Sequence, residues 1–115
     1  MSAQARIVEL ALALPPPNAP IGNYVPFRIA GNILYLSGVG PRKPDGAMIT
    51  GKLGAGVTIE KGYEAARDCG LQLLRNMEVA LGSLDRVDTI IKVLGMVNAA
   101  PDFTDHPKVI NGCTD

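Results

Sequence analysis

The sequence has no tryptophan, a single histidine, two cysteines and no excess of charge of either sign. Its 11 basic and 11 acidic residues give a formal net charge of zero, so nothing favours tight binding to nucleic acid or to an anionic membrane. Three tyrosines and two phenylalanines are too few to offer a platform on which bases could stack. A lone histidine, His106, cannot build a Cys/His metal cage within one protomer. A neutral surface does tolerate self-association.

Long apolar runs are also missing, and none approaches the roughly 18 residues that a membrane span needs. The first residues contain an Ala-Leu-Ala-Leu run, but Arg6 is their only basic residue and Glu9 interrupts the apolar region that a signal peptide would need. We expect a short amphipathic helix over residues 3–13, stopped by the prolines at 15–17, rather than a signal peptide. The protein is expected to be cytoplasmic.

At 115 residues and 12.1 kDa, the chain is long enough for one hydrophobic core and predicts a single domain over residues 1–115. Two cysteines, Cys69 and Cys113, do not make a disulfide framework. Packed thiols are the ordinary interpretation of both, because a single histidine leaves no second one to activate Cys113.

Apolar periodicity and turn residues predict an α+β fold in which helices cover one sheet. The most regular element is a long helix, which Thr58 begins as N-cap and Gly82 ends. A hairpin turn at Gly31-Asn32 joins two strands. The expected strands cover residues 27–30, 33–39, 47–50 and 88–97, residues 51–56 form a loop, Pro44-Asp45-Gly46 is the tightest point of a turn, and a last helix begins near Asp105.

The stretch GAMITGKL at 46–53 nearly spells a phosphate-binding loop. Leu53 stands where a serine or threonine should bind magnesium, and no buried strand precedes the stretch. Its glycines are better explained as turn residues.

Two polar residues are harder to explain by packing. Tyr24 lies in an extended segment between Gly22 and Pro26, where a loop tyrosine either covers the surface or presents its hydroxyl to a ligand. Ser37 interrupts an apolar strand just before Gly38 and either bonds its own backbone or opens a small polar pocket.

The order and spacing of several segments resemble the reactive-intermediate deaminase family, known as RidA or YjgF and also as the endoribonuclease L-PSP family. The resemblance covers the chain from about residue 5 onward, and an N-terminal helix followed by prolines resembles one branch of the family. The matching segments are PIGNYVPF, GNILYLSGVGP, PDGAMITGKL, ALGSLDRV, DTIIKVLGMVN, Asp102-Phe103 and VING at 109–112.

This resemblance implies a chorismate-mutase-like α+β subunit, with one mixed sheet covered by two helices, that forms a homotrimer. It implies a small carboxylate substrate bound at each subunit interface, with no cofactor and no metal. The implied activity is the hydrolysis of reactive enamines and imines, of the 2-aminoacrylate type, to keto acid and ammonia. Residue by residue, Tyr24, Ser37 and Asn111 match positions of the family's substrate cleft.

The arginine that binds the substrate carboxylate in the family and the glutamate that positions water normally lie on the last two strands, beyond Asp115. The remaining arginines are in the wrong segments to replace the missing one. We therefore expect the C-terminal part to be missing and activity to be impaired in these 115 residues, because each of the two roles is commonly worth about 10²–10⁴-fold in rate. Two alternatives stay open: a non-catalytic trimer that binds small carboxylates or partners, and the family's older ribonuclease or translation-inhibitor label, which zero net charge disfavours.

Overall fold

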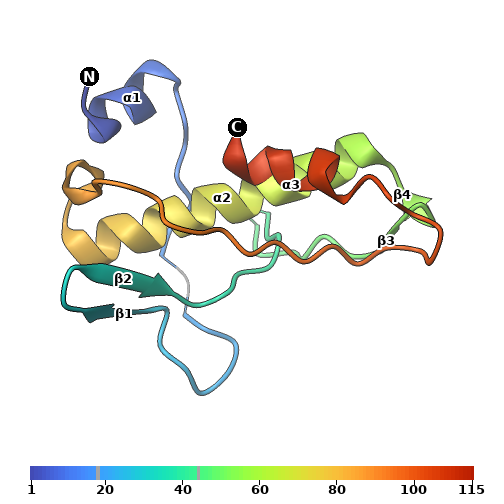
Figure 1. Ribbon diagram of the computed structural model, residues 1–115, viewed down its shortest axis with the longest axis horizontal. Helices are drawn as coiled ribbons and strands as arrows, with labels where there is room; N and C mark the ends of the chain where they lie inside the picture. The colour runs from blue at the N-terminus through green and yellow to red at the C-terminus, as the bar shows by residue number, and fades with distance from the viewer. Residues whose placement is uncertain (18, 44) are drawn as a thin grey trace. The chain divides into compact units, whose positions relative to one another are not determined.

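The computed structural model describes residues 1–17, 19–43 and 45–115. Helices and short strands both occur, in agreement with the predicted α+β class. In chain order the elements are α1 (Ala3–Glu9), β1 (Phe27–Ala30), β2 (Ile33–Leu36), β3 (Lys52–Leu53), β4 (Gly56–Val57), α2 (Ile59–Leu81), the 3-10 turn η1 (Leu84–Arg86) and α3 (His106–Thr114) (Figure 1). None of these helices is both long enough and apolar enough to cross a membrane.

The chain divides into two compact units, and the division runs through α2. The first unit comprises Met1–Val39 and Leu71–Ile91, and the second comprises Gly40–Gly70 and Lys92–Asp115. The expected single domain stays a prediction.

The first unit contains the β1–β2 hairpin, whose strands pair antiparallel from Phe27↔Leu36 to Ala30↔Ile33 (Figure 1). The turn falls at Gly31-Asn32 as predicted, with Gly31 at a φ of +59°. A positive φ at the first of two turn residues suits the right-handed twist of a hairpin. The second strand ends at Leu36, three residues before the predicted end.

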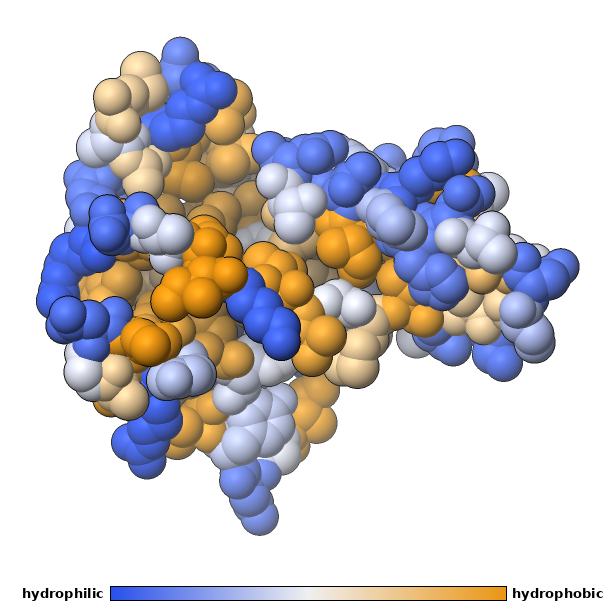
Figure 2. Space-filling view, viewed as in Figure 1, coloured by the Kyte–Doolittle hydropathy of each residue, from blue (hydrophilic) through white to orange (hydrophobic). Residues whose placement is uncertain are grey.

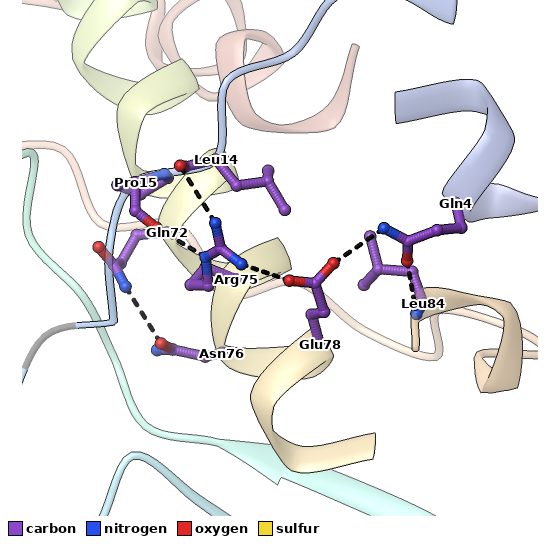
Figure 3. Close-up of polar contacts among 8 residues, drawn as sticks. All are labelled: Gln4, Leu14, Pro15, Gln72, Arg75, Asn76, Glu78 and Leu84. Atoms are coloured by element: carbon purple, nitrogen blue, oxygen red, sulfur yellow. Dashed lines mark hydrogen bonds and ion pairs between the residues drawn. The ribbon is translucent and has the colours of Figure 1, made fainter. Parts of the chain in front are cut away.

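A polar network holds the N-terminal segment of the first unit to α2 and η1 (Figure 3). Arg75 donates from Nε to the carbonyl of Pro15 at 2.7 Å and pairs with Glu78. Glu78 also accepts from the Gln4 side chain at 2.9 Å, while the Gln4 oxygen accepts from the Leu84 N–H at 3.2 Å. Leu84, whose N–H this network binds, is only 2 % exposed.

Helix α1 is shorter than the predicted helix over residues 3–13. It begins after Ser2, whose hydroxyl accepts from the Ala5 N–H at 3.1 Å. It ends at Glu9, and Ala11 takes a φ of +53° that no right-handed helix can hold. The apolar residues that follow Glu9 therefore lie outside the helix.

Leu53 is at the core of the second unit. Its N–H donates to the Asn98 carbonyl at 2.9 Å, and its own carbonyl accepts from Ala100 at 2.9 Å, which makes a parallel bridge to Ala99. Its side chain is buried with Val109 of α3 against Gly62 of α2.

Two glycines allow α3 to lie directly on α2 within the second unit (Figure 1). A Cβ on Gly112 would stand 1.9 Å from the Tyr63 carbonyl oxygen. A Cβ on Gly70 would stand 3.2 Å from the carbonyl oxygen of Cys113. No side chain separates the two backbones at either point.

The strands outside the hairpin differ from the prediction. Residues 51–56, expected as a loop, contain β3 and the first residue of β4, and these two strands pair parallel with Leu53 opposite Val57. The expected strand at 47–50 is reduced to an isolated antiparallel bridge between Met48 and Arg42. In place of one mixed sheet, the described residues form two sheets of two strands each.

The expected strand over residues 88–97 does not form, because these residues belong to neither sheet. Its β-branched composition suits a strand, yet a strand requires a hydrogen-bonded neighbour, which the described residues do not supply here. Apolar side chains of this segment reach the surface. Figure 2 shows that apolar residues, in orange, are among those exposed on the molecule. The large exposed ones in this segment are Ile90, Ile91, Val93, Leu94 and Met96.

Candidate functional site

Tyr24 lies in the first unit, on a bend that precedes β1 and belongs to no helix or strand. Its side chain is 48 % exposed. A Cβ on Gly22 would lie 3.2 Å from two carbon atoms of the Tyr24 ring, so the ring lies against the Gly22 backbone. The Tyr24 side chain is therefore accessible at the surface, and the Gly22 backbone holds its ring in place. A ligand-binding residue needs both properties.

Ser37 follows β2 and is connected to the same bend. The Ser37 N–H donates to the Pro26 carbonyl at 3.0 Å, and the hydroxyl donates to the Val25 carbonyl at 2.6 Å. The hydroxyl therefore bonds the backbone of the bend across the hairpin and not the backbone of Ser37 itself, which was one of the two interpretations of the sequence. Ser37 is thus hydrogen-bonded to the two residues that follow Tyr24 in the chain.

Asn111 lies in the second unit, on α3. Its neighbours on the helix, Val109 and Gly112, are buried against α2, whereas Asn111 is exposed. An exposed carboxamide offers both hydrogen-bond donors and acceptors to a ligand.

Two of the arginines bind backbone carbonyls within the first unit. Arg75 binds the backbone carbonyls of Leu14 and Pro15, and Arg86 donates to the carbonyl of Leu81 at 2.9 Å. The Arg75 network was not foreseen, because a contact between residues sixty positions apart leaves no local signal.

A different polar pair on α2 also escaped prediction. Gln72 and Asn76 are both buried, and the Gln72 amide donates to the Asn76 oxygen at 3.1 Å (Figure 3). Their spacing of four residues on a helix was the only available signal.

The near match to a phosphate loop is not one in the structure. Lys52 begins β3, and α2 does not begin until Ile59, whereas a phosphate loop leads directly into a helix. Gly46, at a φ of +88°, closes a turn by donating to the Lys43 carbonyl, as the sequence suggests for this stretch. Asn18 and Pro44, which the sequence assigns to a loop and a turn, lie outside the described residues.

His106 begins α3 and is exposed, with its ring edge-on to Phe103 at 5.3 Å between centroids. In the described part of the chain, no three His, Cys, Asp or Glu side chains gather as metal ligands would. His106 thus has the surface position expected from its place before Pro107.

The two cysteines lie at the contact between α2 and α3 and form no disulfide. The Cys113 sulfur would stand 3.3 Å from a Cβ on Gly70, the neighbour of Cys69. Burial, with a smaller effect of Cys113 and Asp68, raises the pKa of the Cys69 thiol to about 11. Burial also raises the pKa of Cys113. Both groups are therefore thiols at neutral pH, and packing accounts for them better than reactivity.

We predict that Cys69 reacts slowly with iodoacetamide at pH 7.5 and gains reactivity up to a pH of about 11, because only the thiolate is nucleophilic. The raised pKa also means that folding favours the protonated form. Its contribution to stability is complete below the unfolded value of about 8.5 and is lost as the pH rises toward about 11. Mass-spectrometric labelling rates across this range measure the effect, with urea-unfolded protein as the control. Equal rates for Cys69 in folded and unfolded protein at pH 7.5 would contradict the burial.

The chain is similar to known proteins in both sequence and structure. Residues 4–115 match the family model described as "YjgF/chorismate_mutase-like, putative endoribonuclease". The protein TCP17 of Trypanosoma cruzi is 41 % identical over 111 residues, which cover 96 % of this chain and 69 % of that protein.

Two solved structures are also similar. One, a "putative endoribonuclease" from Shewanella oneidensis, superposes with a TM-score of 0.92 at 33 % identity and covers 99 % of this chain and 76 % of its own. The other, the protein Atu1372 of unknown function from Agrobacterium tumefaciens, has a TM-score of 0.83 at 36 % identity, over 96 % of this chain and 67 % of its own. The predicted chorismate-mutase-like fold is thereby confirmed, and the chain belongs to the YjgF family.

Proposed function

We propose that this protein hydrolyses reactive enamines and imines of the 2-aminoacrylate type to the corresponding keto acid and ammonia, in the cytoplasm. The proposal is carried by family membership over residues 4–115, together with the resemblance of its segments to the reactive-intermediate deaminases. The exposed Tyr24 on its supported bend is consistent with a substrate-binding role.

The reaction needs no redox step. The enamine takes a proton at its terminal carbon to become an iminium ion, the protonated form of the imine, and water then adds its oxygen to the C=N carbon. One proton of the added water passes to the nitrogen, the C–N bond breaks with release of ammonia, and the remaining hydroxyl gives up its proton to leave the keto acid. A protein assists by binding the carboxylate, by donating hydrogen bonds to the nitrogen and by positioning the water.

We assign three residues to the substrate sites, which form where the subunits of a homotrimer meet. The hydroxyl of Tyr24 donates a hydrogen bond to the substrate, and the exposed carboxamide of Asn111 supplies a further polar contact. Ser37 completes the set that the resemblance implies. The site takes a small carboxylate and requires neither metal nor cofactor.

The test is the release of keto acid from an imine formed in the assay. A pyridoxal-phosphate dehydratase generates 2-aminoacrylate from serine, and lactate dehydrogenase with NADH reports pyruvate as it appears. We expect the full-length protein to accelerate pyruvate release above the buffer rate, and its Asn111→Ala variant to do so less. No acceleration would overturn the proposal, and thermal stabilisation by small carboxylates without turnover would identify a binding protein instead.

Endoribonuclease activity is a second candidate, because the matching family and one similar structure carry that description. A net charge of zero gives the chain no electrostatic attraction for RNA, so we rank it below imine hydrolysis. Cleavage of a fluorescent single-stranded RNA, with binding that weakens steeply as salt rises, would reverse this order.

A further inference from the structure

The hydroxyl of Ser37 is turned toward the backbone of the segment that carries Tyr24. A serine hydroxyl has one proton to donate, and that proton goes to the Val25 carbonyl at 2.6 Å. The Ser37 N–H donates to the next carbonyl, that of Pro26, at 3.0 Å. The two donors of Ser37 thus hold the two residues that follow Tyr24.

The position of Ser37 follows from the register of the hairpin. Phe27 pairs with Leu36, and the next pair outward along the two chains is Pro26 with Ser37. Continued pairing at this point lays the bend beside the end of β2. The side-chain bond to Val25 then extends the attachment one residue further, to the neighbour of Tyr24.

The ring of Tyr24 also has a direct contact with the backbone of its own segment. The Gly22 backbone lies close enough that a Cβ there would press on the ring at 3.2 Å. The bend itself belongs to no regular element. The orientation of the ring therefore depends on these local contacts.

We propose that Ser37 is a positioning residue, whose hydroxyl holds the Val25 carbonyl and so fixes Tyr24 in the orientation in which it meets the substrate. This rests on the proposed function, and it replaces the direct substrate contact that the resemblance implies for Ser37. A hydrogen bond of this kind shifts a local equilibrium about 2- to 12-fold. Misplacement of a binding group lowers the rate of the chemical step more than it weakens binding.

The test compares three serine variants in the imine assay and by ¹⁹F NMR of protein labelled with 3-fluorotyrosine. We expect Ser37→Ala to lower kcat about 3- to 10-fold with a smaller change in KM, and to shift the Tyr24 resonance in the ligand-free protein. Ser37→Thr keeps the hydroxyl and should restore both. Ser2→Ala, a serine-to-alanine change in the same unit, should alter neither.

Gly22→Ala tests the orientation of Tyr24 in a second way. Its Cβ displaces the Tyr24 ring without touching Ser37. It should shift the Tyr24 resonance and lower kcat even if Ser37→Ala proves unstable. An inactive wild-type protein would overturn the proposed function. An active wild-type protein whose Ser37→Ala variant keeps its kcat, or keeps the Tyr24 resonance in place, would overturn the positioning role alone.

Discussion

Replacing Gly112 with alanine is expected to destabilise the protein by about 3 kcal/mol or more, a large part of the stability of a typical domain. The new Cβ would stand 1.9 Å from the Tyr63 carbonyl oxygen and 2.8 Å from its carbon, so α3 has to move away from α2. A flexible side chain cannot absorb this overlap, because the obstructing atoms are backbone. Alanine itself favours the helix by about 1 kcal/mol over glycine, so the clash has to exceed that gain. Urea denaturation followed by circular dichroism measures the change.

Two other glycines provide controls, because a Cβ added there would meet a side chain in one case and open space in the other. A Cβ on Gly95 would meet three carbons of the Ile110 side chain and no backbone atom among its nearest neighbours, so Gly95→Ala should cost less than Gly112→Ala, about 1–2 kcal/mol. A Cβ on Gly38 would meet nothing within 4 Å, and Gly38→Ala should be nearly neutral. If Gly112→Ala unfolds at the same urea concentration as Gly38→Ala, the two helices do not lie in backbone contact.

The elements that local signals determine were predictable. Thr58 accepts from the Lys61 N–H at 3.2 Å as an N-cap does, and Gly82 closes α2 with a φ of +81°. The helix between them, Ile59–Leu81, has nearly the bounds that these two residues indicate. Gly31 likewise determines the hairpin turn, because a positive φ is easily adopted there. In each case the physical cause lies within a few residues of the structure it produces.

Elements that depend on distant partners were not predictable. Residues 88–97 have the composition of a strand, but Leu94 is 77 % exposed and the segment belongs to no sheet. Composition measures how well side chains suit a pleated surface and says nothing of whether a neighbour is present. Conversely, β3 and β4 pair within a glycine-rich stretch, where Gly54 and Gly56 take positive φ and let the chain curl back.

The candidate site has some features that local sequence signals determine and others that they do not. The two-residue turn fixes the hairpin register, and that register places Ser37 opposite Pro26, so the backbone bond was implicit in the sequence. The direction of the Ser37 hydroxyl was not, because a serine side chain has several rotamers that its sequence neighbours do not select. Asn111 was identified only through resemblance, since an exposed helical asparagine has no distinguishing local pattern.

Replacing Tyr24 with phenylalanine is expected to lower kcat/KM for imine hydrolysis about 100-fold and to leave the melting temperature unchanged. The change removes one hydroxyl from a side chain that is 48 % exposed, so it opens no cavity and leaves no buried group unpaired. Removing one preorganised hydrogen-bond donor from a transition state typically costs about 10²–10³-fold in rate. The phenyl ring still fits against Gly22, which keeps the bend in place. Pyruvate release from freshly formed 2-aminoacrylate measures the loss.

Tyr35 supplies the matched control, because it is a tyrosine of the same unit, on β2, and is 57 % exposed. Its replacement by phenylalanine removes the same atom at a position to which no role in the reaction is assigned. We expect Tyr35→Phe to keep kcat/KM within about 2-fold of the wild-type value, as surface substitutions away from a site do. An equal loss of kcat/KM in Tyr24→Phe and Tyr35→Phe would show that the Tyr24 hydroxyl has no specific role in the reaction. Full activity in Tyr24→Phe would remove Tyr24 from the reaction and, with it, the reason for Ser37 to hold its backbone.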